Sequence, residues 1–218
     1  MLYIARKADF ELKQSGNEVK NMEQYDLMDR LVEAGNGYLR ASVVREHDIS
    51  KYTLTKYLKT RGMARTAHGV YATVDAWPDS YFLLAVRNSR IVFSHESALY
   101  LHGLMDREPP ATIVTVPEGY NSTHIARQGV RVIHSKPEWY ALGVTKVKTA
   151  FGNEVPVYDR ERTICDMIRC RKDMEVQTFK TAMQEYMSSE KKNLGNLMLY
   201  AKELGIEDNV RIYTEVML

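Results

Sequence analysis

Apolar residues recur at helical spacing near the start of the chain, and polar stretches divide the remaining residues into short elements. The first set predicts an amphipathic helix, because its members lie three or four positions apart and share one face: Tyr25, Met28, Leu31 and Val32. Gly35 and Gly37 end this pattern. A second, shorter helix is predicted over Ser42–His47, and a tight connection through Asp48 and Ile49 leads to a third.

The third helix begins at Ser50, whose hydroxyl can accept hydrogen bonds from the amides of the first turn. At about 100° per residue, Leu54, Tyr57 and Leu58 share the side that would be buried against the preceding helices. The opposite side carries hydroxyl groups and lysines: Tyr52, Thr53, Thr55, Lys56, Lys59 and Thr60. A helix face of this kind, with few carboxylates, favours contact with phosphates.

A basic hairpin that contains His68 and Gly69 is predicted to come next, so the order of elements is helix, turn, helix, wing. Between Arg40 and Thr73 there are seven basic and two acidic residues, a net charge of +5. In a helix-turn-helix protein the second helix of the motif enters the major groove of DNA. Residues 21–75 are therefore predicted to form a winged helix-turn-helix domain that binds double-stranded DNA. The alternative is a small helical domain whose lysines are merely solvated.

The candidate DNA contacts form two groups. Residues of the exposed helix face are the candidates for the major groove: Tyr52, Thr53, Thr55, Lys56 and Lys59. Residues at helix ends and on the wing are the candidates for contacts with the backbone or through the wing: Ser42, Ser50, Lys51, Arg61, Arg65 and His68. Phosphate contacts should set affinity and its salt dependence, and base contacts should set sequence choice.

Short strands and helices are predicted over the second domain, residues 76–218. Pro78 marks the start of its first helix. The predicted strands are Ile91–Phe93, Thr112–Val116, Val130–His134, Val144–Thr149 and Val155–Tyr158, with the last two as a hairpin. Ser94 is expected to cap a helix that ends at Gly103, and Asp159 is expected to cap the first C-terminal helix.

Two or three more helices are predicted after that one, over Val176–Met187, Leu194–Leu204 and Asp208–Met217. The predicted fold class is α+β, with a mostly antiparallel sheet and a helical C-terminal half behind the winged helix-turn-helix. Residues 1–20 are polar and weakly patterned, so they are expected to be an N-terminal extension.

Composition limits the classes of function. The net charge of the 218 residues is +2, so a nucleic-acid footprint must be local rather than spread over the chain. The two cysteines, Cys165 and Cys170, have no second pair, which favours buried thiols in a reducing compartment. No apolar run is long enough to span a bilayer and the N-terminus lacks a signal-peptide core, so a cytoplasmic location without membrane contact is expected.

Catalytic and metal-binding patterns are weak. His95 and His102 are seven residues apart, which is not the spacing of a zinc-binding His-Glu-x-x-His helix. Asp159, Glu161 and Asp166 could indicate a metal-dependent nuclease, but arginines alternate with the first two carboxylates and favour local ion pairs. No glycine-rich phosphate loop occurs. We therefore expect no enzyme, no metal and no cofactor.

Several separated phrases resemble the AbiEi family of antitoxins over roughly residues 23 to 218. They are Gly69–Tyr71 in the wing, Ser94–Arg107, the turn Thr115–Asn121, the segment Gly143–Thr145 and the stretch Lys148–Arg169. The resemblance implies the antitoxin of a type IV toxin–antitoxin system, linked to abortive infection and phage defence. It also implies a repressor whose winged helix binds inverted repeats in the promoter of its own operon.

The same resemblance implies that the C-terminal domain neutralises an AbiEii-like nucleotidyltransferase toxin without a stable complex. It assigns no catalytic residues and no neutralising surface. No heptad or exposed apolar stripe indicates a dimer, so a monomer that binds DNA cooperatively is expected. Two alternatives stay open: a ligand-responsive winged-helix regulator with a sensor domain, and a second domain that acts as a nuclease or modifies the toxin.

Overall fold

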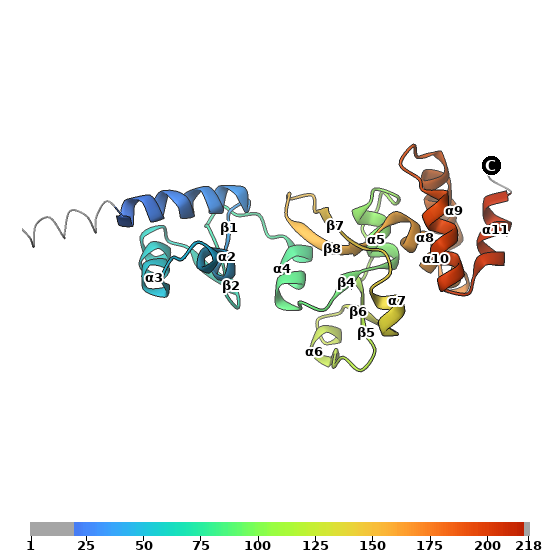
Figure 1. Cartoon of the computed structure of the whole chain (residues 1–218), viewed down its shortest axis with the longest axis horizontal. Coiled ribbons are helices and arrows are strands. Elements are labelled where there is room, and N and C mark those ends of the chain that lie inside the picture. The colour runs from blue at the N-terminus through green and yellow to red at the C-terminus, as the bar shows by residue number, and fades with distance from the viewer. Residues whose placement is uncertain (1–19, 216–218) are drawn as a thin grey trace, which may run out of the picture. The chain divides into compact units, whose positions relative to one another are not determined.

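The computed structural model describes residues 20–215, and the chain divides into two compact units, Met1–Arg87 and Asn88–Leu218 (Figure 1). Almost all of the expected N-terminal extension, residues 1–20, lies outside the described residues. Each unit has its own buried apolar cluster.

The first unit contains a helix over residues 20–34 and two short helices that precede a hairpin. The other elements are β1 (Tyr38–Arg40), α2 (Ala41–Glu46), α3 (Lys51–Thr60), β2 (Ala64–Ala67), β3 (Val70–Ala72) and α4 (Ser80–Arg87). The three strands form an antiparallel sheet in the order β1-β3-β2. This succession of a helix, two shorter helices and a hairpin is the one that the hydrophobic pattern predicts.

The core of the first unit comes from the apolar positions that define those helices. Its buried members are Met28, Leu39, Val44, Ile49, Leu54 and Tyr57. Tyr25, Leu31, Val32 and Leu58 are partly buried and pack against it, as their spacing predicts. Asp48 has φ of 55°, and this left-handed residue makes the tight connection between α2 and α3.

The boundary between the units lies later than the predicted one at residues 75 and 76, because α4 packs on the first unit. The rings of Phe82 and Tyr38 lie 5.1 Å apart between centroids. Arg87 Nη2 donates to the carbonyl oxygen of Thr66 at 2.8 Å. Pro78 does precede a helix, but that helix belongs with the sheet of β1, β2 and β3.

The second unit contains a five-stranded sheet in the order β6-β5-β4-β8-β7. The C-terminal helices of the unit lie to one side of it (Figure 1). The strands of the sheet are β4 (Val92–Phe93), β5 (Ile113–Pro117), β6 (Arg131–Ser135), β7 (Val144–Lys148) and β8 (Glu154–Tyr158). The expected hairpin of the last two strands is confirmed.

The sheet is mixed rather than mostly antiparallel. The pairs β4–β5 and β7–β8 are antiparallel, whereas β5–β6 and β4–β8 are parallel. The parallel pair of β5 and β6 is possible because α6 (Thr123–Ala126) and its flanking loops carry the chain back between these two strands. The hydrophobic pattern predicted neither this helix nor α7 (Pro137–Tyr140).

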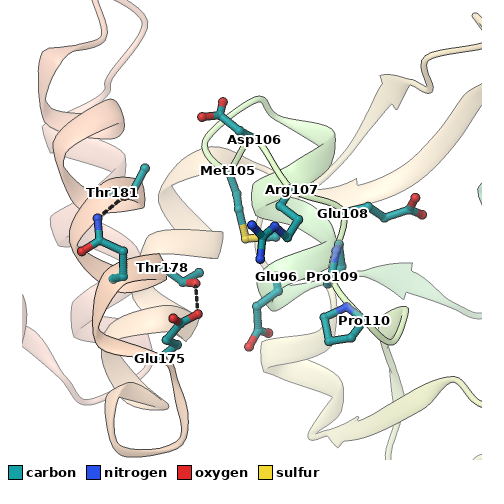
Figure 2. A pocket seen from close by; sticks show the side chains of 11 residues that line it. Glu96, Met105, Asp106, Arg107, Glu108, Pro109, Pro110, Glu175, Thr178 and Thr181 are labelled. Atoms are coloured by element: carbon teal, nitrogen blue, oxygen red, sulfur yellow. Dashed lines mark hydrogen bonds between the residues drawn. The ribbon is translucent and has the colours of Figure 1, made fainter.

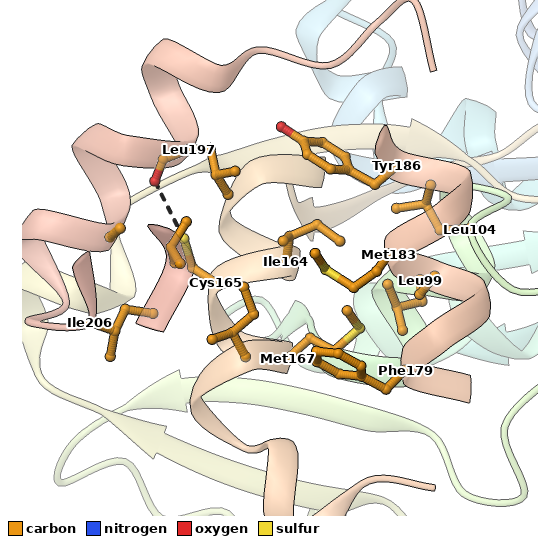
Figure 3. Close-up of a cluster of buried hydrophobic side chains, with 14 of the residues drawn as sticks. Leu99, Leu104, Ile164, Cys165, Met167, Phe179, Met183, Tyr186, Leu197 and Ile206 are labelled. Atoms are coloured by element: carbon orange, nitrogen blue, oxygen red, sulfur yellow. Dashed lines mark hydrogen bonds between the residues drawn. The ribbon is translucent and has the colours of Figure 1, made fainter. Parts of the chain in front are cut away.

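The helical C-terminal half surrounds one almost completely buried helix, α8 (Arg160–Arg169). Besides α6, α7 and α8, the described part of the unit has the helices α5 (His95–Leu101), α9 (Val176–Ser188), α10 (Leu194–Glu203) and α11 (Glu207–Glu215), and a 3-10 turn at Arg171–Asp173. Figure 3 shows the apolar side of α8 with Ile164, Cys165 and Met167 between residues of α9 and α10. The Cys165 thiol is buried and donates to the carbonyl oxygen of Leu197 at 3.6 Å.

Of the two helix caps predicted in the second unit, one is confirmed and the other is wrong. Asp159 caps α8 as expected, since its Oδ1 accepts from the amide of Arg162 at 2.8 Å. Ser94 occupies the N-cap position of α5 but makes no capping bond. Its Oγ instead accepts from the Thr115 hydroxyl of β5 at 2.9 Å, so that part of the prediction is wrong.

Candidate nucleic-acid interface

The start of α3 is held by its own side chains. Ser50 Oγ accepts from the amide of Thr53 at 3.1 Å, which confirms the predicted cap. The hydroxyls of Ser50 and Thr53 are also 3.0 Å apart. Both side chains therefore have local partners, and the first turn of the helix is fixed before any ligand binds.

The outer face of α3 is exposed and holds most of the predicted groove residues. Tyr52 is 77% exposed, the second highest exposure among the large apolar residues of the described chain. Thr55, Lys56 and Lys59 are also exposed. The Thr55 hydroxyl donates to the carbonyl oxygen of Lys51 at 2.8 Å, so its oxygen is left to accept rather than to donate.

The lysines of α3 lack carboxylate partners. Among residues 20–215, no ion pair involves Lys51, Lys56 or Lys59. Glu46 and Asp48 are the only acids in the stretch from Arg40 to Thr73, which keeps the local charge positive. Unpaired exposed ammonium groups can exchange their counterions for phosphates.

Arg61 differs from the lysines, because it already has a partner. Its guanidinium forms an ion pair with Asp29 of the helix over residues 20–34. The ion pair raises the pKa of Arg61, so the side chain stays charged. Sequence reasoning missed Asp29. The only sign of its role in the sequence was its position next to Met28 of the apolar stripe. The apolar pattern of a helix does not predict which other helix it will contact.

The hairpin brings its two predicted residues together. Arg65 Nη2 lies 3.0 Å from His68 Nδ1, and Arg65 Nε donates to the carbonyl oxygen of Ala67 at 3.3 Å. An arginine only donates, so His68 Nδ1 is the acceptor in this contact. Gly69, with φ of 69°, makes the turn between β2 and β3.

The start of α2 lies beside the turn of the hairpin. The amide of Ala41 donates to the carbonyl oxygen of Gly69 at 2.8 Å. Ser42, the next residue, is exposed. The structure therefore places the candidates in two groups. Lys51, Tyr52, Thr53, Thr55, Lys56 and Lys59 lie on α3, with Ser50 and Arg61 as its caps, and Ser42, Arg65 and His68 lie around the hairpin.

In the second unit, the acids that could have indicated a nuclease point to separate partners. Asp166 forms ion pairs with Arg162 at 3.1 Å and Arg169 at 3.4 Å. Glu161 accepts from the Tyr186 hydroxyl at 3.1 Å and the Asn193 amide at 2.8 Å. Within the described residues, no group of three or more histidines, cysteines and acids could hold a metal ion.

His95 is the first residue of α5 and His102 is its C-cap, and both side chains are largely shielded from solvent. His102 Nε2 donates to the carbonyl oxygen of Tyr158 at 2.7 Å. His95 lies 3.6 Å from the Cys170 Sγ through its Nε2, and its Nδ1 has no hydrogen-bond partner. Burial lowers the pKa of both imidazoles, and it raises the pKa of the Cys170 thiol. A neutral thiol beside a neutral imidazole is not an activated nucleophile.

The second unit also has a cavity of about 640 Å³ between the loop after α5 and the first turns of α9. Figure 2 shows Thr178 and Thr181 of α9, with its N-cap residue Glu175, on one side and Glu96, Met105 and Arg107 on the other. Thr178 donates to Glu175 Oε2 at 3.1 Å. No ion pair joins Arg107 to an acid in the part of the chain that the structure describes.

No helix within residues 20–215 combines the length and the apolar character that crossing a membrane requires. No protein-family model matches the sequence, and a search of curated proteins finds no match. Among solved structures, the chain is similar to the crystal structure of the RV2827C protein from Mycobacterium tuberculosis, with a TM-score of 0.42 and 11% identity. That match covers 86% of this chain and 78% of the other.

Proposed function

We propose that the first unit is a winged helix-turn-helix domain that binds double-stranded DNA. The observation that carries this proposal is the outer face of α3, where Tyr52 and three unpaired lysines are exposed beside a basic hairpin. In this arrangement α3 lies in the major groove and the hairpin, with Arg65 and His68, lies along the adjacent backbone. The net charge of this stretch, +5, supplies the phosphate attraction.

The target is the promoter of the protein's own operon, and the second unit is an antitoxin that acts against a nucleotidyltransferase toxin without a stable complex. The resemblance of residues 94–107, 115–121 and 148–169 to AbiEi antitoxins supports this part. The chain works as a type IV antitoxin and autorepressor, is not an enzyme, and occupies inverted repeats as cooperating monomers. Its location is the cytoplasm, where the operator and the toxin are found.

The DNA-binding part is tested by fluorescence anisotropy with a labelled duplex from the region upstream of the gene. The full chain should bind this duplex in preference to a scrambled one, and the affinity should fall steeply as salt rises. Equal, salt-independent affinity for both duplexes would reject the proposal. Sedimentation of the free protein and of the complex gives the number of copies bound.

The antitoxin part is tested by co-expression with the nucleotidyltransferase encoded next to the gene. Growth should be restored by the full chain and by a variant in which Lys51, Lys56 and Lys59 are all alanine, because neutralisation does not need the operator. Substitution of Asp159, Glu161 and Asp166 by their amides, one at a time and in a chain that still folds, should leave rescue intact. Loss of rescue by a folded variant would favour the enzyme hypothesis for the second unit.

A second candidate function is a ligand-responsive regulator, and the cavity beside α9 is the observation that favours it. Its volume is within the range of small-molecule sites, and Arg107 and Glu96 offer charges of both signs. A metabolite that changes operator affinity in the native chain, but not in an Arg107→Ala variant, would support the regulator over the antitoxin.

A further inference from the structure

One carboxylate of the first unit contacts both Tyr57 of α3 and Arg61, the C-cap of that helix. Asp29 Oδ1 accepts from the Tyr57 hydroxyl at 2.7 Å and from Arg61 Nε at 3.0 Å. Asp29 Oδ2 accepts from Arg61 Nη2. The Arg61 guanidinium also lies 5.9 Å from the centre of the Tyr57 ring. Asp29 thus joins the helix over residues 20–34 to the C-terminal end of α3.

The Arg61 contact uses only one edge of the guanidinium. The group is planar and carries five N–H donors, of which the Nε and Nη2 edge is engaged by Asp29. No hydrogen bond from Nη1 to another described residue is found, and the side chain is 46% exposed. Because the guanidinium is rigid, a partner that fixes one edge also fixes the direction of the other.

We propose that Asp29 is a positioning residue of the DNA interface, which holds Arg61 so that its free edge donates to a backbone phosphate next to the end of α3. The inference rests on the proposed function, since it needs a duplex bound at α3. It adds a residue from outside the helix-turn-helix segment, and an acidic one, to the group that controls affinity.

The acidic character of Asp29 makes the test decisive, because two explanations predict changes of opposite sign in the affinity for DNA. If only net charge matters, removal of a carboxylate near the interface should strengthen binding to a polyanion. If Asp29 positions Arg61, its removal should weaken binding, because the guanidinium must then be ordered at the moment of contact. A bond that only holds the two helices together predicts lower stability with no specific loss of affinity.

The experiment compares Asp29→Asn with Asp26→Asn in the full chain. Asp26 is an exposed carboxylate one turn earlier on the same helix, and none of the ion pairs of the described chain involves it. The two variants lose the same charge. Asp29→Asn should weaken binding to the promoter duplex by about three- to tenfold and reduce the salt slope by about one unit, the effect of one lost phosphate contact. Asp26→Asn should bind as tightly as the native chain or slightly more tightly.

The coupling to Arg61 is measured by a double-mutant cycle. In an Arg61→Ala background, Asp29→Asn should no longer weaken binding. Arg61→Lys keeps the charge but loses the planar guanidinium with its two donor edges, so it should bind as weakly as Asp29→Asn. If Asp29→Asn is unfolded by circular dichroism, Asp29→Glu replaces it in the cycle, because it keeps the charge and displaces the carboxylate.

Each outcome bears on a different statement. The inference would be overturned if Asp29→Asn and Asp26→Asn bound the duplex with equal affinity. It would also be overturned if Asp29→Asn weakened binding as much in the Arg61→Ala background as in the native chain. Either result would leave the DNA-binding proposal standing. A native chain that shows no salt-sensitive binding to the duplex would overturn both.

Discussion

Charged side chains have opposite environments in the two units. On α3 the lysines are exposed and have no carboxylate partner among the described residues, so they are available to a ligand at little cost. On α8 the side chains of Arg162 and Asp166 are each 1% exposed and pair at 3.1 Å. A buried charge without its partner is costly, so the pair on α8 holds this unit together. The exposed lysines of α3 carry no such structural role, and we propose that they contact a ligand.

The lysines of α3 should contact different parts of the DNA. Lys56→Ala should weaken operator binding by about 1–3 kcal/mol and relax selectivity at one base pair, because we expect Lys56 to contact a base edge. Lys59→Ala and Arg65→Ala should weaken binding to all sequences alike and flatten the salt slope by about one unit each. Anisotropy titrations over a set of operator variants measure both effects, with Lys180→Ala of the exposed face of α9 as the control. A loss confined to one base pair in Lys59→Ala would contradict this assignment.

The buried pair of α8 should control stability. Arg162 donates to Asp166 and to the carbonyl oxygens of Trp139 and Leu142, and it lies 4.2 Å from the centre of the Tyr158 ring. Arg162→Ala leaves the Asp166 charge buried with one partner fewer, so we expect it to lower the free energy of unfolding by about 3–5 kcal/mol. Urea denaturation measures this loss, and the exposed Arg127→Ala serves as the control, with an expected change below about 0.5 kcal/mol.

Stability should also fall in mild acid because of the two buried imidazoles. Burial holds the pKa of His95 and His102 below the unfolded value of about 6.5, so the unfolded chain takes up these protons first. Their contribution is complete above that pH and is lost as the pH falls toward the native values, at about 1.4 kcal/mol per pH unit for each group. Urea denaturation from pH 8 to pH 5.5 measures the slope. His95→Gln and His102→Gln should each flatten it, and an unchanged slope in both would contradict the assignment.

At the scale of an element, the N-caps of the helices show which hydrogen bonds can be predicted from neighbouring residues alone. Ser50 and Asp159 cap their helices because the amides they bind are only three residues away. Ser94 has the same residue type in the same position, yet its hydroxyl binds Thr115, which lies 21 residues later on β5. A cap can be predicted from sequence unless a strand brings a competing partner, and the sequence does not reveal which strands will be neighbours.

The sheet of the second unit shows the same limit. The hairpin of β7 and β8 was predictable, since the two strands are adjacent in sequence with a short turn between them. The parallel pair of β4 and β8, with Phe93 opposite Val157, joins segments more than sixty residues apart. The apolar pattern of each strand is satisfied equally well by several neighbours, so it predicts the strands and not their order.

At the scale of the whole molecule, the two units should be separable at Arg87. A fragment that ends at Arg87 keeps α4, with the contact between Phe82 and Tyr38 and the bond from Arg87 to Thr66. A fragment that ends at Asp75 loses them and should be less stable by about 1.5–3 kcal/mol for the lost burial of Phe82 alone. Thermal denaturation followed by circular dichroism tests this. Equal melting temperatures for the two fragments would contradict the later boundary.

The sequence by itself determined most of the helices and strands, α6 and α7 excepted, and the apolar side of the longer ones, because these depend on the spacing of residues within one element. It also located the cationic stretch from Arg40 to Thr73, since charge density along the chain needs no fold to be counted. The assignment of its residues to bases or phosphates stays a prediction.

Only the tertiary structure decided the contacts between distant segments. It placed α4 with the first unit, made the sheet mixed, and set Asp29 against Tyr57 and Arg61 of α3. The physical reason is the same in each case. The chemistry of an apolar face or a charged side chain determines the type of partner that it needs. Several segments of the chain can supply a partner of that type, so the packing of the whole unit determines which segment does.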